Sequence, residues 1–256
     1  MKLLFIPNWN GHLYLSEKND NSVIKIYNDV IKNVHKLNIN NVELLKVEKN
    51  NMNLTNRIIE KKYIYEINMN NENNQKNKII SITGDHSNTF PLFKAFSKNN
   101  KEPKLIIFDA HPDVEISTDC ISHEDYLRNL IEKNIIKPEN IYLFGIRTFS
   151  RTEFEYLENK KINYFTITDI LKNKTKIKEI LKLINGNIYL SLDIDVLDPD
   201  FAPGTYYKEW CGLNINELLE FISIIKDKVN NIDICEYFSE NDENNITLNN
   251  ILKIIK

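Results

Sequence analysis

The sequence predicts an α/β fold in which a mostly parallel sheet is covered by helices on both faces. Short apolar, β-branched segments alternate with longer segments whose apolar residues recur at helical spacing. The short segments are almost continuously apolar, which is typical of parallel strands that are buried on both faces. Hydrophobic residues make up 42% of the 256 residues, which is enough for a core between the sheet and its helices.

Seven short segments are predicted as strands, because each is rich in Ile, Leu, Val, Tyr or Phe and most stop at a turn-forming or polar residue. They are residues 3–7, 79–83, 105–109, 141–145, 164–166, 188–193 and 232–236. Six amphipathic segments are predicted as helices: residues 22–36, 123–133, 152–160, 169–184, 216–229 and 247–255. Asn214 followed by Glu217 has the pattern of a capped helix start.

Residues 41–77 interrupt this alternation. Segments 42–47 and 63–69 have the composition of strands, and Asn-rich stretches separate and follow them. We therefore expect an insertion or a hairpin here, with a polar loop near residues 70–77. The sequence contains neither an internal repeat nor a linker, so residues 1–256 are expected to form one domain that carries this atypical insertion.

Charge and cysteine content limit the classes of partner. The net charge of −3 provides no basic field for nucleic acid. Three widely spaced cysteines, Cys120, Cys211 and Cys235, argue against a disulfide framework and a cysteine zinc site, and favour a reducing, cytoplasmic location. The N-terminal apolar run is too short for a signal sequence, and no stretch approaches the roughly 20 apolar residues of a membrane span. We therefore expect a cytoplasmic protein without a membrane or nucleic-acid partner.

Histidines and carboxylates follow four of the predicted strands. Segment 79–83 leads into Gly-Asp-His86, segment 105–108 leads into Asp109-Ala-His111-Pro-Asp113, and the two later strands end at Asp193 and Glu236. The carboxyl ends of parallel strands line the ligand crevice of an open α/β sheet. These side chains are therefore expected to meet at one edge of the sheet.

This set of residues favours metal binding over simple turn formation. Asp193 and Asp195 alternate along a strand and so share a face, although an isolated pair of this kind can equally cap a turn. His86 and the carboxylates of the DAHPD segment add further hard ligands and no thiolate, which favours manganese or magnesium over structural zinc. Six ligands are too many for one catalytic ion with an open position and fit a pair of ions.

Three motifs together resemble the signature of the arginase and agmatinase (ureohydrolase) family. GDHS at 84–87, DAHPD at 109–113 and SLDIDVLDPDFAPGT at 191–205 match it in order and spacing, and the similarity runs from about residue 78 to the C-terminus. The resemblance implies an arginase-like, three-layer α/β/α fold with two Mn²⁺ ions. One ion would be held by His86, Asp109, Asp113 and Asp193, and the other by Asp109, His111, Asp193 and Asp195.

The resemblance also implies a reaction, which is hydrolysis of a guanidino group to urea and an amine. Asp113 would pass a proton to the leaving amine, His123 would shuttle protons, and Glu236 would pair with the guanidinium. Other roles stay open: His123 can be a surface histidine at a helix start, and Glu236 a structural carboxylate. Relatives often form trimers or hexamers, so a homo-oligomer is implied by resemblance alone.

Departures from the family pattern bear on the substrate. Thr83 replaces a glycine and Tyr237-Phe238 replace Asn-Pro, but neither change removes a ligand. Glu115 stands where arginases have an asparagine that binds the α-carboxylate, so it is expected to repel a carboxylate and tolerate an amine or a neutral amide. A small guanidino compound such as agmatine, or an arginine-containing peptide, is therefore expected in preference to free arginine. Trp9 and His12 are further candidates for the rim of the site, although Trp9 fits the core equally well.

Several alternatives compete with this interpretation. Asp193-Ile-Asp195-Val resembles the nucleophile motif of haloacid dehalogenase-type phosphatases, but it occurs late in the chain and leaves DAHPD without a role. A deacetylase on the same fold, or another amidino or amide hydrolase, would use fewer of these ligands or a different substrate. A metal-binding homologue without catalysis is the non-enzymatic alternative.

Overall fold

A parallel sheet of eight strands organises the part of the chain that the computed structural model describes, which is residues 1–12, 20–37, 41–48, 51–72, 78–117 and 119–256. The strand order is β2-β1-β3-β8-β7-β4-β5-β6, and every neighbouring pair is parallel. The strands are β1 (Lys2–Ile6), β2 (Asn41–Leu44), β3 (Ile79–Thr83), β4 (Lys104–Phe108), β5 (Ile141–Ile146), β6 (Asn163–Thr166), β7 (Ile188–Asp193) and β8 (Val229–Cys235).

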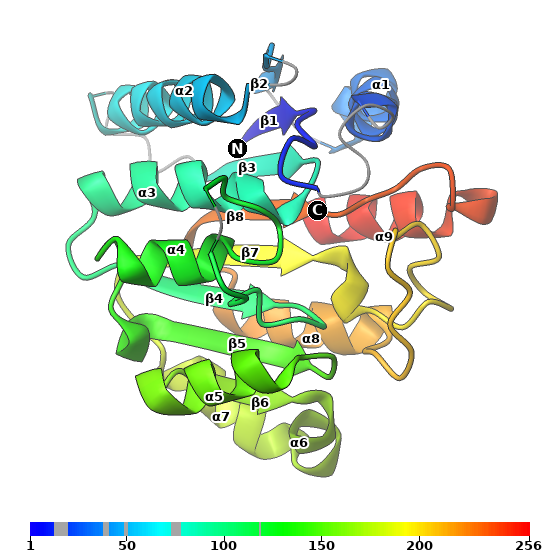
Figure 1. Ribbon diagram of the computed structural model, residues 1–256. Helices are drawn as coiled ribbons and strands as arrows, with labels where there is room; N and C mark the ends of the chain where they lie inside the picture. The colour runs from blue at the N-terminus through cyan, green and yellow to red at the C-terminus, as the bar shows by residue number, and fades with distance from the viewer. Residues whose placement is uncertain (13–19, 38–40, 49–50, 73–77, 118) are drawn as a thin grey trace.

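Helices cover both faces of this sheet (Figure 1). On one face pack α1 (Asp20–Leu37), α6 (Ile167–Lys172), α7 (Lys174–Leu183), α8 (Ile215–Ile225) and α9 (Ile246–Ile255). On the other pack α2 (Met52–Glu72), α3 (Thr89–Asn99), α4 (Tyr126–Glu132) and α5 (Arg151–Lys160). Side chains of β1 alternate between the two cores, with Leu3 and Phe5 in one and Leu4 and Ile6 in the other. The predicted three-layer α/β/α fold is confirmed.

Most predicted elements are present with shifted ends. The predicted helix at 169–184 is two helices, α6 and α7, that meet at Asn173. Asn214 and Glu217 form the reciprocal cap expected at the start of α8. Helix α3 was not predicted, although Phe93 and Phe96 on it are buried in the core. No helix among the described ranges is long and apolar enough to cross a membrane.

The prediction for residues 41–77 is wrong in two respects. Strand β2 lies parallel to β1, so it is not part of a hairpin. Residues 63–69 belong to helix α2, because Ile59, Tyr63 and Ile67 recur every four residues and are buried on one face of that helix. The predicted polar loop at 70–77 begins inside α2, and its residues 73–77 lie outside the described part.

The strand order places four consecutive strands, β3, β8, β7 and β4, at the centre of the sheet. All four run in the same direction, so their carboxyl ends meet at one edge. This is the edge at which the predicted functional residues lie.

Candidate metal centre

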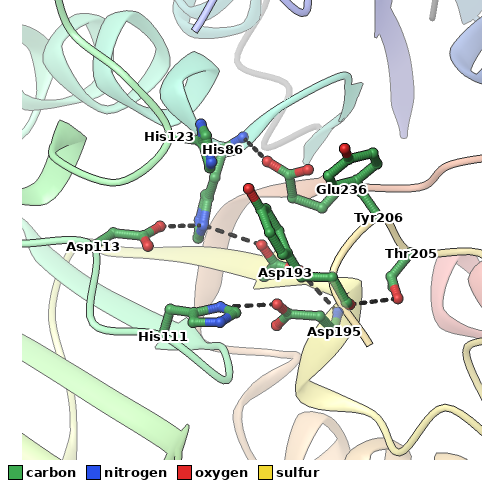
Figure 2. A pocket seen from close by; sticks show the side chains of 10 residues that line it. His86, His111, Asp113, His123, Asp193, Asp195, Thr205, Tyr206 and Glu236 are labelled. Atoms are coloured by element: carbon green, nitrogen blue, oxygen red, sulfur yellow. Dashed lines mark hydrogen bonds and ion pairs between the residues drawn. The ribbon is translucent and has the colours of Figure 1, made fainter. Parts of the chain in front are cut away.

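Histidines and carboxylates from the four central strands converge at the carboxyl edge of the sheet (Figure 2). His86 opens the short 3-10 turn after β3, and Asp109 directly follows β4. Asp193 is the last residue of β7, and Glu236 directly follows β8. Elements far apart in the sequence therefore place these side chains around one pocket.

Three carboxylates surround one nitrogen of the His86 ring. Its Nδ1 lies 3.0 Å from Asp109 Oδ2, 3.0 Å from Asp113 Oδ2 and 3.4 Å from Asp193 Oδ2. The opposite nitrogen, Nε2, lies 2.9 Å from Ser191 Oγ and 3.0 Å from the Tyr126 hydroxyl, which fix the ring plane. Among the described residues, neither His86 Nδ1 nor Asp109 Oδ2 has a partner at hydrogen-bond geometry. Both atoms therefore face a common point without satisfying each other.

A second group of ligand atoms lies beside the first and shares Asp109 with it. His111 Nδ1 lies 3.0 Å from Asp195 Oδ2 and 3.6 Å from Asp109 Oδ1. Asp109 thus offers one carboxylate oxygen to each group. The backbone fixes the two aspartates, since Asp195 Oδ1 accepts the Ala110 N–H at 3.0 Å and Asp109 Oδ1 accepts the His111 N–H at 2.7 Å.

Burial of so many carboxylates makes the pocket electrostatically unfavourable by itself. Burial, together with Asp195 and Asp109, raises the pKa of Asp193 well above its usual value. Burial and the neighbouring Asp109 raise the pKa of Asp113 to about 7. Burial, with Asp193 and Asp85, also raises the pKa of Glu236. Carboxylates in this situation hold protons unless cations replace them.

The donor set fits two hard divalent cations. It contains four carboxylates and two imidazoles with unsatisfied buried atoms between them, and such an oxygen-rich set without thiolate suits manganese or magnesium. Cys235 lies near His86 and Asp193, but burial raises the pKa of its thiol and its Sγ lies 3.6 Å from the Leu192 carbonyl. A protonated thiol is a poor ligand, so Cys235 is left outside the set.

His123 lies at the pocket with one ring nitrogen held by the chain. Its Nδ1 is 3.0 Å from the Gly11 carbonyl oxygen, so Nδ1 carries the proton and donates it there. The residue lines the pocket, and its Nε2 has no hydrogen-bond partner among the described residues and lies 3.8 Å from Glu124 Oε1. The His12 ring stacks on it at 4.4 Å, while Trp9 is buried. His123 is therefore a buried residue of the pocket wall, with one ring nitrogen bound to the chain and the other left without a hydrogen bond in the described structure.

Glu236 lines the pocket at the end of β8, which lies between β3 and β7 in the sheet. Its Oε1 accepts the backbone N–H of His86 at 2.8 Å, and its own N–H donates to the Gly84 carbonyl at 2.8 Å. Both Glu236 and Asp113 have left-handed backbone, with φ of 63° and 52°. Such conformations are uncommon outside glycine and are retained where the surrounding structure enforces them.

The sequence matches a known protein family. Residues 16–256 match the model of the Arginase family. The chain belongs to the arginase family.

Individual relatives show how far this similarity extends. The agmatinase of Halalkalibacterium halodurans is 40% identical over 149 residues, which are 57% of this chain and 50% of that protein. The arginase of Staphylococcus aureus is 30% identical over 239 residues, or 84% of this chain and 78% of the other. The chain spans about half the length of the first agmatinases it matches. Formimidoylglutamase from Bacillus subtilis shares the fold, with a TM-score of 0.85 at 22% identity over 99% of this chain and 84% of that one.

The loop between β7 and α8 supplies pocket residues that the sequence analysis of this arginase-family chain missed. Thr205, Tyr206 and Tyr207 line the metal pocket, whose volume is about 20 Å³. Glu209 lies 3.4 Å from His111 Nε2. The run of aromatic and charged residues directly after the matching motif was the available signal. Glu115, in contrast, lines an adjoining groove and not the metal pocket.

Proposed function

We propose that this arginase-family protein hydrolyses a guanidino group to urea and an amine, using two manganese ions. The observation that carries the proposal is the pair of adjoining ligand groups, His86–Asp109–Asp113 and Asp109–His111–Asp195, which share the Asp109 carboxylate. His86 and Asp113 would hold one ion, His111 and Asp195 the other, and Asp109 and Asp193 both. When bound, such a pair of ions lowers the pKa of water and supplies a nucleophile at neutral pH.

Three side chains of the protein would bind the substrate and transfer protons during the reaction. Glu236 lies at the pocket beside the ligands, where its carboxylate can pair with a planar guanidinium through two hydrogen bonds. Asp113 would hand a proton to the departing amine. His123 would exchange protons with solvent through Nε2, since its Nδ1–H is already committed to Gly11. The two tyrosines of the 205–207 loop would exclude bulk water.

Charge in the adjoining groove supports the expected substrate preference. Glu115 lines that groove together with Glu124 and Glu209. Free arginine would bring its α-carboxylate toward these groups, whereas agmatine carries an ammonium and peptidyl arginine a neutral amide. We therefore propose agmatine or arginine within a peptide as the substrate, in preference to free arginine.

The test is urea release by the purified, manganese-loaded protein from arginine, agmatine and an arginine-containing peptide, with metal content measured in parallel. Urea from at least one compound, lost on chelation and restored by Mn²⁺, is the expected result. Absence of urea from all three while two metals are bound would contradict the proposal. If Mg²⁺ restores urea release and Mn²⁺ does not, the proposed metal is wrong and the proposed reaction stands. A cytoplasmic location and a homo-oligomer remain part of the proposal, and cell fractionation and sedimentation test them.

A further inference from the structure

The two candidate histidine ligands are held in different ways. His86 is buried, and its Nε2 lies 2.9 Å from Ser191 Oγ, which in turn donates to Asp233 Oδ1 at 2.7 Å. Groups of the core therefore hold that ring. The His111 side chain is 24% exposed, and its Nε2 lies 3.4 Å from Oε1 of Glu209, which belongs to the loop between β7 and α8. A loop residue thus supports the second histidine.

Glu209 contacts the ring nitrogen of His111 that faces away from the other candidate ligands. His111 Nδ1 lies 3.0 Å from Asp195 Oδ2 and 3.6 Å from Asp109 Oδ1, whereas Nε2 is the nitrogen beside the Glu209 carboxylate. A neutral imidazole has one N–H and one lone pair, and the partner of one nitrogen determines which nitrogen can bind a metal. Because a carboxylate only accepts, Glu209 favours the tautomer with the proton on Nε2 and the lone pair on Nδ1.

The segment between β5 and α5 holds Glu209 in this position. Its Oε2 accepts the Thr148 hydroxyl at 2.6 Å, while Oε1 is the oxygen near His111. Nη2 of Arg147 donates to the backbone carbonyls of Glu209 at 2.9 Å and of Asp195 at 2.6 Å. Arg147 therefore ties the backbone of Glu209 to that of a candidate ligand. A carboxylate that is already fixed orients its partner at a lower entropic cost than a mobile one.

Glu209 also differs from a second carboxylate of the same groove. Glu115 lines the groove as well and is partly exposed. Among the described residues, neither a hydrogen bond nor an ion pair joins the Glu115 side chain to a candidate metal ligand. The two residues therefore separate the charge of the groove, which both supply, from contact with His111, which only Glu209 of the two provides.

We propose that Glu209 is a positioning residue for the second of the two proposed ions, acting through His111. This role rests on the proposed two-metal site and belongs to a residue that is not itself a ligand. Without Glu209, the His111 ring can rotate and exchange its tautomer, so the second ion should bind more weakly. The first ion should keep its affinity, because buried groups hold His86.

The test is a titration of the metal-free, full-length protein with Mn²⁺ in competition with a fluorescent chelator, which gives a Kd for each ion. Loss of a carboxylate that orients a metal-bound histidine weakens metal binding by about 10- to 100-fold. Glu209 is partly exposed, so we expect Glu209→Ala to raise one Kd by about ten-fold and to leave the other within about two-fold. Glu209→Gln keeps the volume and one acceptor oxygen, so it should raise the same Kd by only about three-fold.

Two further variants show whether the contact or the charge is responsible. Glu115→Gln is the matched control, because it removes a carboxylate charge from the same groove, and it should leave both Kd values within about two-fold. Thr148→Val removes the hydroxyl that holds Glu209 and should change the same Kd in the same direction, by less than Glu209→Ala does. The Tm of the metal-free variants should match that of the wild type.

A spectroscopic readout identifies the affected site. With diamagnetic Cd²⁺ in place of Mn²⁺, the ring ¹⁵N shifts of His111 should show a proton on Nε2 in the wild type and altered shifts in Glu209→Ala. Those of His86 should not change. Urea release lost in Glu209→Gln should return with excess Mn²⁺, and a loss that excess Mn²⁺ does not restore would contradict a role in positioning.

The titration also separates failure of this role from failure of the proposed reaction. Unchanged Kd values in Glu209→Ala, equal weakening of both ions, or the same weakening in Glu115→Gln would overturn the role of Glu209. None of these outcomes depends on turnover. A wild-type protein that binds two ions and releases no urea would reject the reaction alone, while one that binds fewer than two ions would reject both.

Discussion

The metal pocket and the groove beside it share side chains, but they differ in the burial and in the hydrogen bonding of their polar groups. In the pocket, His86, Asp109 and Asp193 are buried, and buried polar atoms of the first two lack hydrogen-bond partners in the described structure. In the groove, Glu115 and Glu209 are partly exposed, and Glu209 already has hydrogen-bonding neighbours. The pocket thus contains buried polar atoms without partners, which the proposed cations would supply, whereas Glu209 in the groove is already paired.

This contrast suggests that the pocket determines the rate of the reaction and that the groove determines which substrate is preferred. A buried, unsatisfied set of charges has a large effect on whatever binds among them, because no solvent screens it. Half-exposed carboxylates on a groove wall interact weakly and act mainly by discriminating between ligands of different charge. Changes in the pocket should therefore alter kcat by orders of magnitude, and changes in the groove should alter selectivity by smaller factors.

The largest effect is expected from Asp193→Ala. It removes a carboxylate proposed to contact both ions, so urea release should fall by about 10³-fold or more and bound metal should decrease. Urea release and metal content measured on the same preparation check this. Asp200→Asn, an exposed carboxylate in the following loop, is the control and should retain both. Full activity in Asp193→Ala would remove the basis for the two-metal site.

The next largest effect is expected from His123→Asn. This variant removes Nε2 from the pocket while leaving the metal ligands, so kcat should fall by about 10²-fold with little change in KM. Steady-state kinetics with agmatine separate the two parameters. A rise in KM at constant kcat would instead make His123 a substrate contact.

Metal removal should make stability depend on pH in a predictable direction. Burial raises the pKa of Asp113 to about 7, so between about pH 4 and 7 the folded metal-free state keeps a proton that the unfolded state has lost. The free energy of unfolding therefore falls as pH rises through this range. For each kcal/mol by which it falls, Tm should drop by about 2–4 °C. Thermal scans at pH 5 and 7 check this, and added Mn²⁺ should raise Tm more at pH 7. A Tm that rises with pH in the metal-free protein would contradict it.

The smallest effect is expected in the groove. Glu115→Gln removes one partly exposed charge, so kcat/KM for free arginine should rise about two- to five-fold relative to agmatine. The ratio of the two values, measured at low and at 0.5 M salt, checks this. If salt erases the difference between the wild type and the variant, the effect is electrostatic; a ratio that Glu115→Gln leaves unchanged at low salt would contradict it.

The parts of the molecule that could be predicted from sequence are those in which local pattern and tertiary role agree. Strands β3, β4, β7 and β8 are short apolar runs that stop at His86, Asp109, Asp193 and Glu236, so strand direction alone brings these residues together. Helix α2 was mistaken for a strand because Tyr63 and Ile67 favour β structure locally, while their spacing fits packing against α3. The contact with α3 therefore outweighs the local β preference of these residues.

The aromatic wall of the pocket could not be predicted by the same reasoning. Tyr206 and Tyr207 lie in a loop whose path depends on hydrogen bonds that side chains of other segments, including Arg147 and Asn241, donate to its backbone carbonyls. His12 reaches His123 only because the turn after β1 passes beside it, with Gly11 N–H donating to Asp85 Oδ2 at 2.9 Å. Neither contact leaves a periodic signal in the sequence.

The strand order also determines when the pocket can form during synthesis. β3 and β4 follow each other in the chain, but β8 and β7, which separate them in the sheet, are made last. Before residue 188 leaves the ribosome, the strands can pair only as two separate three-stranded sheets, β2-β1-β3 and β4-β5-β6, with one edge of β3 and one edge of β4 unpaired. Joining them requires two strands to insert side by side, a step dominated by contacts distant in sequence and therefore slow. A nascent chain would thus hold His86 and Asp109 on different sheets, and metal capture would mark the completion of folding.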